Sequence, residues 1–188
     1  MNIIFICHGN ICRSPAAEII FSDLVKENNL DINVSSRATS LEEIGNDIYP
    51  PMRRVLHNHG YIDVHHSATR ISRSEFESAD YIFYMDKNNL YYLERLFGPS
   101  DKYHLITEYL DNVEIEDPWY TDRFEFVYQR IKKAVEAIIN FLLVALILFI
   151  IIKVINSVHR KGVEAKEKLE AKMKKEEAPA EEEKKEEK

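Results

Sequence analysis

Short apolar runs alternate with amphipathic stretches through the first two thirds of the chain. Residues 2–7 (NIIFIC) are a continuous apolar run with the length of a buried parallel strand. Segments 32–38, 80–86 and 103–107 are predicted to be three further strands. Helical patterns separate these runs. The sequence therefore predicts an α/β fold in which helices cover both faces of a four-stranded parallel sheet.

Apolar residues recur at helical spacing between the predicted strands. The first helix is expected to follow Ser14 as its N-cap, with Pro15 at its first position. Segments 49–60 and 87–98 are predicted helices that each end on a glycine. Segment 121–139 is predicted to be a long amphipathic helix.

The pattern changes near Ala137. Residues 137–152 carry no charge, and thirteen of the sixteen are Ile, Leu, Val or Phe. Membrane insertion of these thirteen is favoured by about 4–8 kcal/mol before Asn140 is counted, and Lys153 can snorkel to lengthen the run. An over-long core helix is the alternative, but this run is apolar all round. We therefore expect a hydrophobic, membrane-type helix over 138–160.

The last segment, 161–188, consists almost entirely of Glu, Lys and Ala. It lacks an apolar face, so we expect a solvated helix to about Glu177 and disorder after Pro179. The predicted organisation is thus a domain over 1–141, the hydrophobic helix over 138–160, and this charged tail.

The charge and the cysteine content of the chain disfavour some classes of function. The formal net charge is −7, and the acidic excess lies before Lys153 because the tail is nearly balanced. An acidic body disfavours nucleic-acid binding, since phosphate contacts need a positive face. The two cysteines, Cys7 and Cys12, cannot form a disulfide framework and indicate a reducing compartment and a reactive role. The N-terminus shows no signal-peptide pattern.

Both cysteines lie in a loop of the form C-x5-R-S between the first predicted strand and helix. Backbone N–H groups of a tight loop at a helix N-terminus can bind phosphate oxygens. Gly9 allows close backbone approach, and Asn10 can hold a left-handed turn or brace the loop. Arg13 offers a planar fork for phosphate oxygens. Cys7, on the loop floor in this positive field, is expected to attack as a thiolate.

The string FICHGNICRSPAAE, residues 5–18, resembles the active-site loop of the low-molecular-weight protein tyrosine phosphatases. Residues 35–60 are similar to the family's second-strand and substrate-loop region. Residues 81–90 resemble its M-D..N-L segment, and 116–131 its D-P-aromatic loop and last helix. The resemblance covers about 1–141. It implies a phosphatase I-like fold and a cysteine-dependent phosphatase that acts on protein phosphotyrosine.

The resemblance assigns roles to matching positions. Cys7 would form a phosphocysteine intermediate, Arg13 would bind phosphate, and Asp117 would protonate the leaving oxygen and then activate water. Cys12 would bond to Cys7 on oxidation and protect it reversibly. The residues expected to bind phosphate or support the loop are His8, Gly9, Asn10, Ile11, Cys12 and Ser14, with Ser14 also helping the thiolate to leave. His66 is expected to brace Asn10, with His65 as the alternative. No metal or organic cofactor is implied.

Four residues bear on the substrate. Ile11 matches family members that act on phosphotyrosine, whereas phosphoarginine phosphatases tend to have threonine there. Glu42 replaces an aromatic residue common on the substrate wall, but Trp119 and Tyr120 supply aromatic surface opposite. An acidic wall disfavours acidic peptides. Thioredoxin-coupled arsenate reductases share this fold and loop, but they need relay cysteines that this chain lacks.

Residues 137–161, with the later KKEEAPAEEE, resemble the second transmembrane helix and tail of the large-conductance mechanosensitive channels. The pore-lining first helix is missing, so we expect no working channel. Segment 138–158 would instead anchor a cytoplasmic catalytic domain to a membrane or form helix-mediated oligomers. A span would export basic residues such as Arg160, against the positive-inside tendency. An interfacial helix, an oligomer and a chain joined by design or recombination remain open.

Two classes of function follow. The leading interpretation is a phosphotyrosine phosphatase that carries a membrane-type helix. The alternative is a membrane-anchored or assembly protein that uses the phosphatase domain as a scaffold, or a chimera with a non-functional channel fragment. A non-catalytic phosphate-binding module is disfavoured because Cys7, Arg13 and Asp117 are all present.

Overall fold

The computed structural model describes the backbone of residues 1–186 and the side chains of residues 1–164 and 166. It divides into two units, Met1–Phe141 and Leu142–Lys188. The first unit contains the sheet and the candidate chemistry. The end of the charged tail, residues 187–188, lies outside the described residues.

A four-stranded parallel sheet forms the centre of the first unit, which confirms the predicted fold class. Its strands are β1 (Asn2–Cys7), β2 (Asn33–Ala38), β3 (Tyr81–Tyr84) and β4 (Tyr103–Leu105), in the order β2-β1-β3-β4. The chain leaves β1 towards β2 and later returns to its other side as β3. In such sheets ligands bind outside the carboxyl ends of the strands, where the order reverses. Here that position is the end of β1 and β3.

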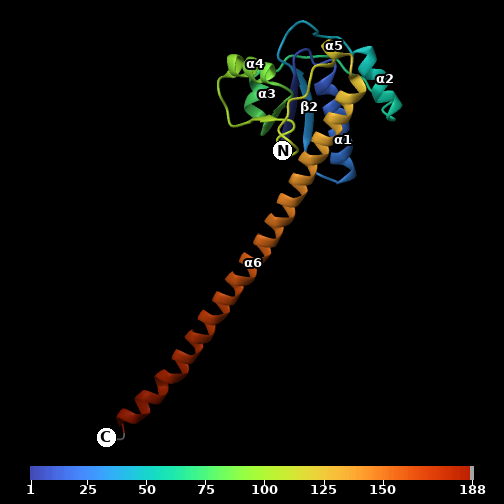
Figure 1. Ribbon diagram of the computed structural model, residues 1–188. Helices are drawn as coiled ribbons and strands as arrows, with labels where there is room; N and C mark the ends of the chain where they lie inside the picture. The colour runs from blue at the N-terminus through green and yellow to red at the C-terminus, as the bar shows by residue number, and fades with distance from the viewer. Residues whose placement is uncertain (187–188) are drawn as a thin grey trace. The chain divides into compact units, whose positions relative to one another are not determined.

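Helices lie on both faces of the sheet, as predicted (Figure 1). The helices are α1 (Arg13–Glu27), α2 (Pro50–Asn58), α3 (Arg73–Ser78), α4 (Lys87–Phe97), α5 (Pro118–Thr121) and α6 (Phe124–Glu186). On one face Phe5 of β1 meets Phe21 of α1 edge-on, with ring centroids 5.4 Å apart. The first turns of α6 bury Val127, Ile131 and other apolar residues of the same core.

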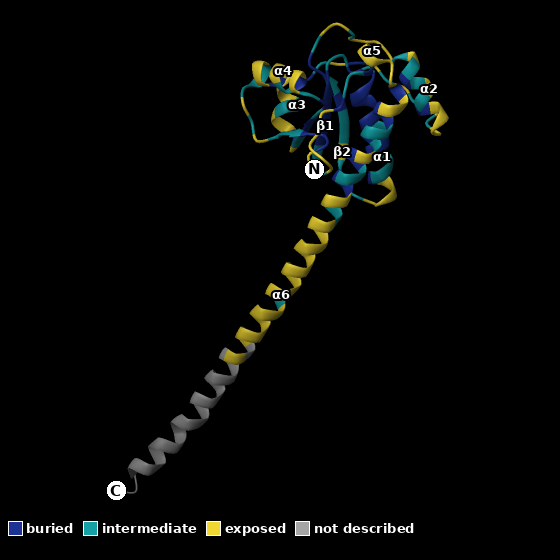
Figure 2. Ribbon diagram, viewed as in Figure 1, coloured by how far each residue is buried: buried dark blue, intermediate teal, exposed yellow. Residues whose placement is uncertain are grey.

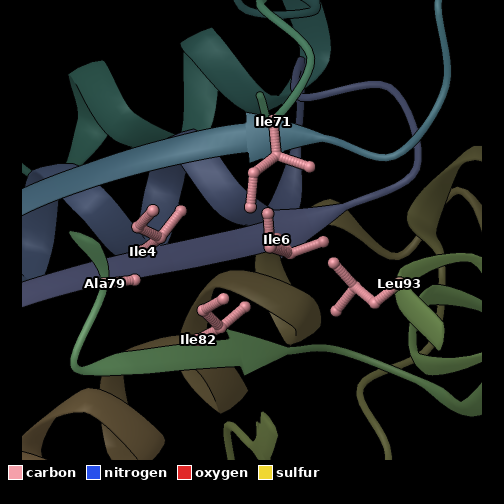
Figure 3. Close-up of a cluster of buried hydrophobic side chains, with 6 residues drawn as sticks. All are labelled: Ile4, Ile6, Ile71, Ala79, Ile82 and Leu93. Atoms are coloured by element: carbon pink, nitrogen blue, oxygen red, sulfur yellow. The ribbon is translucent and has the colours of Figure 1, made fainter. Parts of the chain in front are cut away.

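The opposite face of the sheet has its own apolar cluster. Ile4 and Ile6, which alternate with Phe5 along β1, join Ile82 of β3 and Leu93 of α4 (Figure 3). Each of these four side chains is at most 5% exposed. Alternate residues of β1 point to opposite faces, and both faces are covered, so residues 3–7 of this strand are all apolar and buried. The loop that follows it therefore starts from the buried end of β1.

The helices differ from the predictions at two boundaries and in one additional helix. Helix α1 begins at Arg13 with Cys12 as N-cap, so the prediction of Ser14 as N-cap is wrong. Ser14 lies inside the first turn because its hydroxyl contacts Asn10 and Cys7 instead. Helix α3 was not predicted, although Ser72 and Glu75 form a capping box at its start. Helix α6 continues past Pro179 to Glu186, where we expected disorder; residues of high helix propensity flank this proline.

The apolar part of α6 is exposed from Val144 onwards, whereas Ile138 and Ile139 at its start are buried (Figure 2). Large apolar side chains such as Ile147, Ile151 and Ile155 are each about half exposed. Among the described residues, one helical segment, Phe124–Glu164, is long and apolar enough to cross a membrane by length and composition, and little of its apolar window is buried.

Candidate active site

Asn10 organises the loop that joins β1 to α1. It is fully buried and adopts a left-handed backbone conformation with φ 58°, which asparagine tolerates better than most residues. Its side-chain amide donates to Ser14 Oγ at 2.9 Å and to Ser36 Oγ at 2.8 Å, and accepts from the Thr69 backbone N–H at 3.1 Å. These bonds tie the loop to α1, to β2 and to the segment after α2.

One further hydrogen bond and the close packing at Gly9 determine the course of the loop backbone. His66 Nε2 lies 2.7 Å from the Asn10 carbonyl oxygen, so His66 rather than His65 braces this residue, and it does so through the main chain. A Cβ atom on Gly9 would come within 2.9 Å of Glu43 Cγ. This close approach explains why a glycine suits the position.

Cys7 lies at the floor of the loop and is almost fully buried. Its Sγ atom is 3.0 Å from Ser14 Oγ, and the Asn10 backbone N–H donates to the same sulfur at 3.3 Å. Two hydrogen-bonding groups therefore face the sulfur, and both can stabilise a thiolate.

Arg13 is only 2% exposed, and two carboxylates pair with it. Its Nη1 donates to Asp86 Oδ2 at 2.5 Å and to the Ile115 carbonyl at 3.1 Å, and its Nη2 donates to Asp117 Oδ2 at 2.6 Å. Burial lowers the pKa of Arg13, but the charges of Cys7, Asp117 and Asp86 outweigh it and raise this pKa above its ordinary value. Arg13 is thus a permanent buried cation at the loop.

Asp117 is the N-cap of α5, and its side chain accepts a hydrogen bond from the Trp119 backbone N–H at 3.1 Å. The Trp119 ring packs on Tyr49, with centroids 5.0 Å apart. The Tyr49 backbone N–H in turn donates to the Ile11 carbonyl at 2.8 Å. Tyr49 thereby links the segment that carries Asp117 to the loop that carries Cys7.

These elements enclose a cavity of about 210 Å³ at the carboxyl end of β1. Its lining comprises Cys7, His8, Gly9, Ile11, Cys12, Arg13, Glu42, Glu43, Asp117, Trp119 and Tyr120. Every predicted site residue thus lines the cavity except Asn10 and Ser14, which are buried, and His66, which contacts the Asn10 backbone. At the rim, His8 Nε2 lies 3.0 Å from Glu42 Oε2, while Tyr120 is 85% exposed.

Cys12 differs from Cys7 in its electrostatic surroundings. Burial, together with the negative charges of Cys7 and Asp117, raises the pKa of the Cys12 thiol far above its ordinary value. Cys12 is therefore a neutral thiol at physiological pH. Within the part of the chain that the structure describes, no three His, Cys, Asp or Glu side chains converge as a metal site.

Sequence reasoning missed several residues that support the site. Asp86 was not predicted, although it follows β3 at the same sheet edge as Cys7 and a buried arginine requires a counter-charge. Ser36 and Thr69 support Asn10 from segments far along the chain. Glu43 lies over Gly9 and lines the cavity. Only the position of Asp86 after a strand gave a usable signal.

Comparisons with known proteins agree with this geometry. The family description "Low molecular weight phosphotyrosine protein phosphatase" matches residues 2–145. A phosphatase of that name from Homo sapiens is 38% identical over 152 residues, covering 74% of this chain and 94% of the relative. The crystal structure of YfkJ from Bacillus subtilis has a TM-score of 0.69 at 30% identity, covering 74% of this chain and 92% of that one. A structure of the YwlE arginine phosphatase gives a TM-score of 0.69 at 25% identity, with 76% and 95% covered.

The match to the family extends over most of the chain, and the relatives are covered almost completely. The chain therefore belongs to the low-molecular-weight phosphotyrosine protein phosphatases and is a hydrolase that uses cysteine-based catalysis.

Proposed function

We propose that this chain hydrolyses phosphotyrosine on proteins through a phosphocysteine intermediate on Cys7, with Arg13 and Asp117 as its catalytic partners. The observation that carries the proposal is that these three side chains line one cavity, with Arg13 in direct contact with Asp117. A nucleophile, a phosphate-binding cation and a proton donor within one pocket are the groups that phosphoryl transfer requires.

In the first step the Cys7 thiolate attacks phosphorus, and the bond from phosphorus to the tyrosine oxygen breaks. Asp117 gives its proton to this leaving oxygen. The loop N–H groups and Arg13 stabilise the charge on the other phosphate oxygens. To do so, the Arg13 Nη2 group, which contacts Asp117 in this structure, turns towards a phosphate oxygen.

In the second step Asp117, now ionised, takes a proton from a water molecule that attacks the phosphocysteine. The bond from sulfur to phosphorus breaks, inorganic phosphate leaves, and the thiolate returns. Ser14, 3.0 Å from the sulfur, stabilises the departing thiolate by a hydrogen bond. The YwlE arginine phosphatase structure, which carries a phosphorylated active-site serine in a cysteine-to-serine mutant, supports phosphate transfer to this loop position.

Cys12 would protect the nucleophile against peroxide. Hydrogen peroxide oxidises the Cys7 thiolate to a sulfenic acid, and the Cys12 thiol then condenses with it, which releases water and forms a disulfide. Two cellular thiols, which are themselves oxidised to a disulfide, would supply the two electrons that restore both cysteines. The neutral state of Cys12 supports this division of roles, since it is the less nucleophilic thiol before oxidation.

Phosphotyrosine is proposed as the substrate because two aromatic side chains line the cavity on one side. Trp119 and Tyr120 can pack against a phenyl ring, and Ile11 gives an apolar wall beside the loop. The resemblance to an arginine phosphatase makes phosphoarginine the alternative to exclude. Peptides of one sequence that carry either phosphotyrosine or phosphoarginine should differ in kcat/KM by at least about 100-fold in favour of phosphotyrosine.

The control for this assay is the variant Ile11→Thr. Its kcat/KM values for the phosphotyrosine and phosphoarginine peptides should differ less than those of the wild type. A wild-type preference for phosphoarginine would overturn the proposed substrate, whereas turnover of neither peptide would overturn the proposed enzyme activity. Neutral and basic flanking residues should be tolerated better than acidic ones, because Glu42 and Glu43 line the cavity.

We also propose that segment 138–158 attaches this phosphatase to a membrane, with the catalytic domain in a reducing, cytoplasmic compartment that keeps Cys7 a free thiol. The support is the apolar, exposed surface of α6, together with the resemblance of this segment to a channel's second transmembrane helix. An interfacial helix accommodates Arg160 and Lys161 better than a full span does.

Flotation with liposomes tests this attachment. The full chain should float, and the double variant Ile147→Lys with Ile151→Lys should not, while both hydrolyse a soluble phosphopeptide equally in detergent. If the full chain stays unbound and sediments as a defined oligomer, helix-mediated assembly replaces the membrane proposal. If Cys7→Ser abolishes turnover but leaves every cellular phenotype intact, the domain acts as a scaffold.

A further inference from the structure

A chain of hydrogen bonds runs from Cys7 to Glu18, a carboxylate on α1 that takes no part in the chemistry above. Ser14 Oγ lies 3.0 Å from Cys7 Sγ, and Asn10 Nδ2 donates to Ser14 Oγ at 2.9 Å. The same Nδ2 group donates to Ser36 Oγ at 2.8 Å. Ser36 Oγ donates to Glu18 Oε2 at 2.5 Å.

The direction of each bond from Glu18 to Ser14 is determined, and the direction of the bond to Cys7 follows when the sulfur is a thiolate. A carboxylate only accepts hydrogen bonds, so the single hydroxyl proton of Ser36 goes to Glu18. Ser36 Oγ is then left to accept from Asn10, and the second proton on Asn10 Nδ2 goes to Ser14. The Cys7 thiolate has no proton to donate, so the Ser14 hydroxyl, which accepts from Asn10, donates its own proton to the sulfur.

A second contact requires the same orientation of Asn10. The Thr69 backbone N–H can only donate, and it lies 3.1 Å from Asn10 Oδ1. The amide nitrogen must therefore face the two serines. Glu18 at one end and Thr69 at the other thus impose one arrangement of protons on a buried group whose backbone is in the left-handed region.

We propose that Glu18 is a positioning residue of the active site, which acts through Ser36, Asn10 and Ser14 to aim the Ser14 hydroxyl at the Cys7 sulfur. This inference rests on the proposed function, because it concerns the leaving of the thiolate in the second step. What matters is the acceptor oxygen at residue 18 rather than its charge. Without an acceptor at residue 18, the Ser36 hydroxyl no longer has a fixed orientation. Its oxygen then no longer holds the Asn10 amide in one position, although Ser14 still contacts that amide.

The test compares two substitutions of similar size in the full chain. Glu18→Met removes the acceptor and should lower kcat for p-nitrophenyl phosphate about tenfold, the effect of losing one well-aligned hydrogen bond. Glu18→Gln keeps an acceptor oxygen and should stay within about twofold of wild type. Glu27→Gln, an exposed carboxylate at the end of the same helix, is the matched control and should have no effect.

A double-mutant cycle separates positioning from general loss of stability. In a Ser14→Ala background, Glu18→Met should cost no more than about twofold further, because the path from Glu18 to the sulfur is already cut. Ser36→Ala, which breaks the same chain at another link, should reproduce the loss if Glu18→Met folds poorly. Thermal unfolding of each variant provides the check on folding.

The inference is overturned if Glu18→Met and Ser36→Ala both retain wild-type kcat, if Glu18→Gln falls as far as Glu18→Met, or if the effects of Glu18→Met and Ser14→Ala multiply. These outcomes differ from failure of the proposed function, in which the wild-type chain itself shows no turnover.

Discussion

Arg13 Nη2 lies 2.6 Å from Asp117 Oδ2, although 104 residues separate the two in the chain. The same guanidinium also contacts Asp86 and the Ile115 carbonyl through its other terminal nitrogen. One planar cation thus joins the phosphate loop to the end of β3 and to the segment that carries the proposed general acid. This arrangement holds Asp117 at the cavity before substrate arrives.

The planar fork of Arg13 is the basis of the first prediction. Arg13→Lys keeps the charge but cannot contact Asp86, Asp117 and phosphate oxygens at once, since an ammonium group lacks the fork. We expect kcat/KM to fall by about 100- to 1000-fold, the usual effect of removing a transition-state donor. Arg130→Lys is the matched control, because Arg130 pairs with Asp111 at the surface. Equal activities of the two variants would contradict this role of Arg13.

The leaving group provides a second prediction. Asp117→Asn removes the proton donor, so kcat/KM should fall by about 100-fold or more for a phosphotyrosine peptide. The fall should be much smaller for p-nitrophenyl phosphate, whose leaving phenolate needs less help from an acid. Asp122→Asn is the control, because Asp122 adopts the left-handed conformation that asparagine also accepts. Equal losses on both substrates would show that Asp117 does not protonate the leaving oxygen.

The fold could be predicted because its signals are local. The run NIIFIC and the helix ends at Gly60 and Gly98 are visible in the sequence, and glycine at these ends has positive φ. The strand order β2-β1-β3-β4 is set by which strands pair across the chain, and the pattern of one segment carries no such information. For this reason the layers could be predicted from the sequence, whereas the order in which the strands pair could not.

The residues of the candidate site likewise fall into those with local sequence signals and those brought together only by folding. Cys7, Arg13 and the other loop residues lie close together in sequence, so their chemistry could be read from one string. Ser36, Thr69 and Asp86 reach the loop only through folding. Ser14 shows how the two levels compete. Its position before a proline favours an N-cap. Its hydroxyl instead accepts a hydrogen bond from the buried Asn10 and contacts the Cys7 sulfur.

The two cysteines should react at different rates. Burial and nearby negative charge raise the pKa of Cys12, so this thiol remains protonated and weakly nucleophilic at pH 7. One equivalent of iodoacetate at pH 7 should therefore modify Cys7 at least about tenfold more than Cys12, and inorganic phosphate should slow that reaction. Peptide mapping by mass spectrometry gives the ratio. Comparable labelling of both residues would contradict the assigned environments.

Alkaline pH should destabilise the domain through Tyr128, which is buried, and Tyr103, which is partly buried. Burial, with smaller effects of nearby Tyr61 and Glu125, raises the pKa of Tyr128 to about 12, and burial with Glu94 raises the pKa of Tyr103 to about 12. The unfolded chain loses these protons near pH 10, whereas the folded chain keeps them until about pH 12. The unfolded state therefore binds fewer protons in this window, and stability falls as pH rises through it.

Urea unfolding at pH 9 and pH 11 measures this loss. Tyr128→Phe removes one of the two groups, so its midpoint should fall less between the two pH values than the wild-type midpoint does. Tyr120→Phe is the control, because Tyr120 lies at the exposed rim of the cavity. An identical fall in the wild type and Tyr128→Phe would show that Tyr128 does not contribute.

The central claim is that Cys7 carries the phosphate during turnover. The most direct measurement is rapid acid quench of the full chain in detergent, mixed with a phosphotyrosine peptide labelled with ³²P, followed by mapping of the labelled site. We expect a label that appears within one turnover, maps to the peptide containing Cys7, decays as substrate is used up, and is absent in Cys7→Ala. Undiminished phosphate release by Cys7→Ala, or a transient label on another residue, would contradict it.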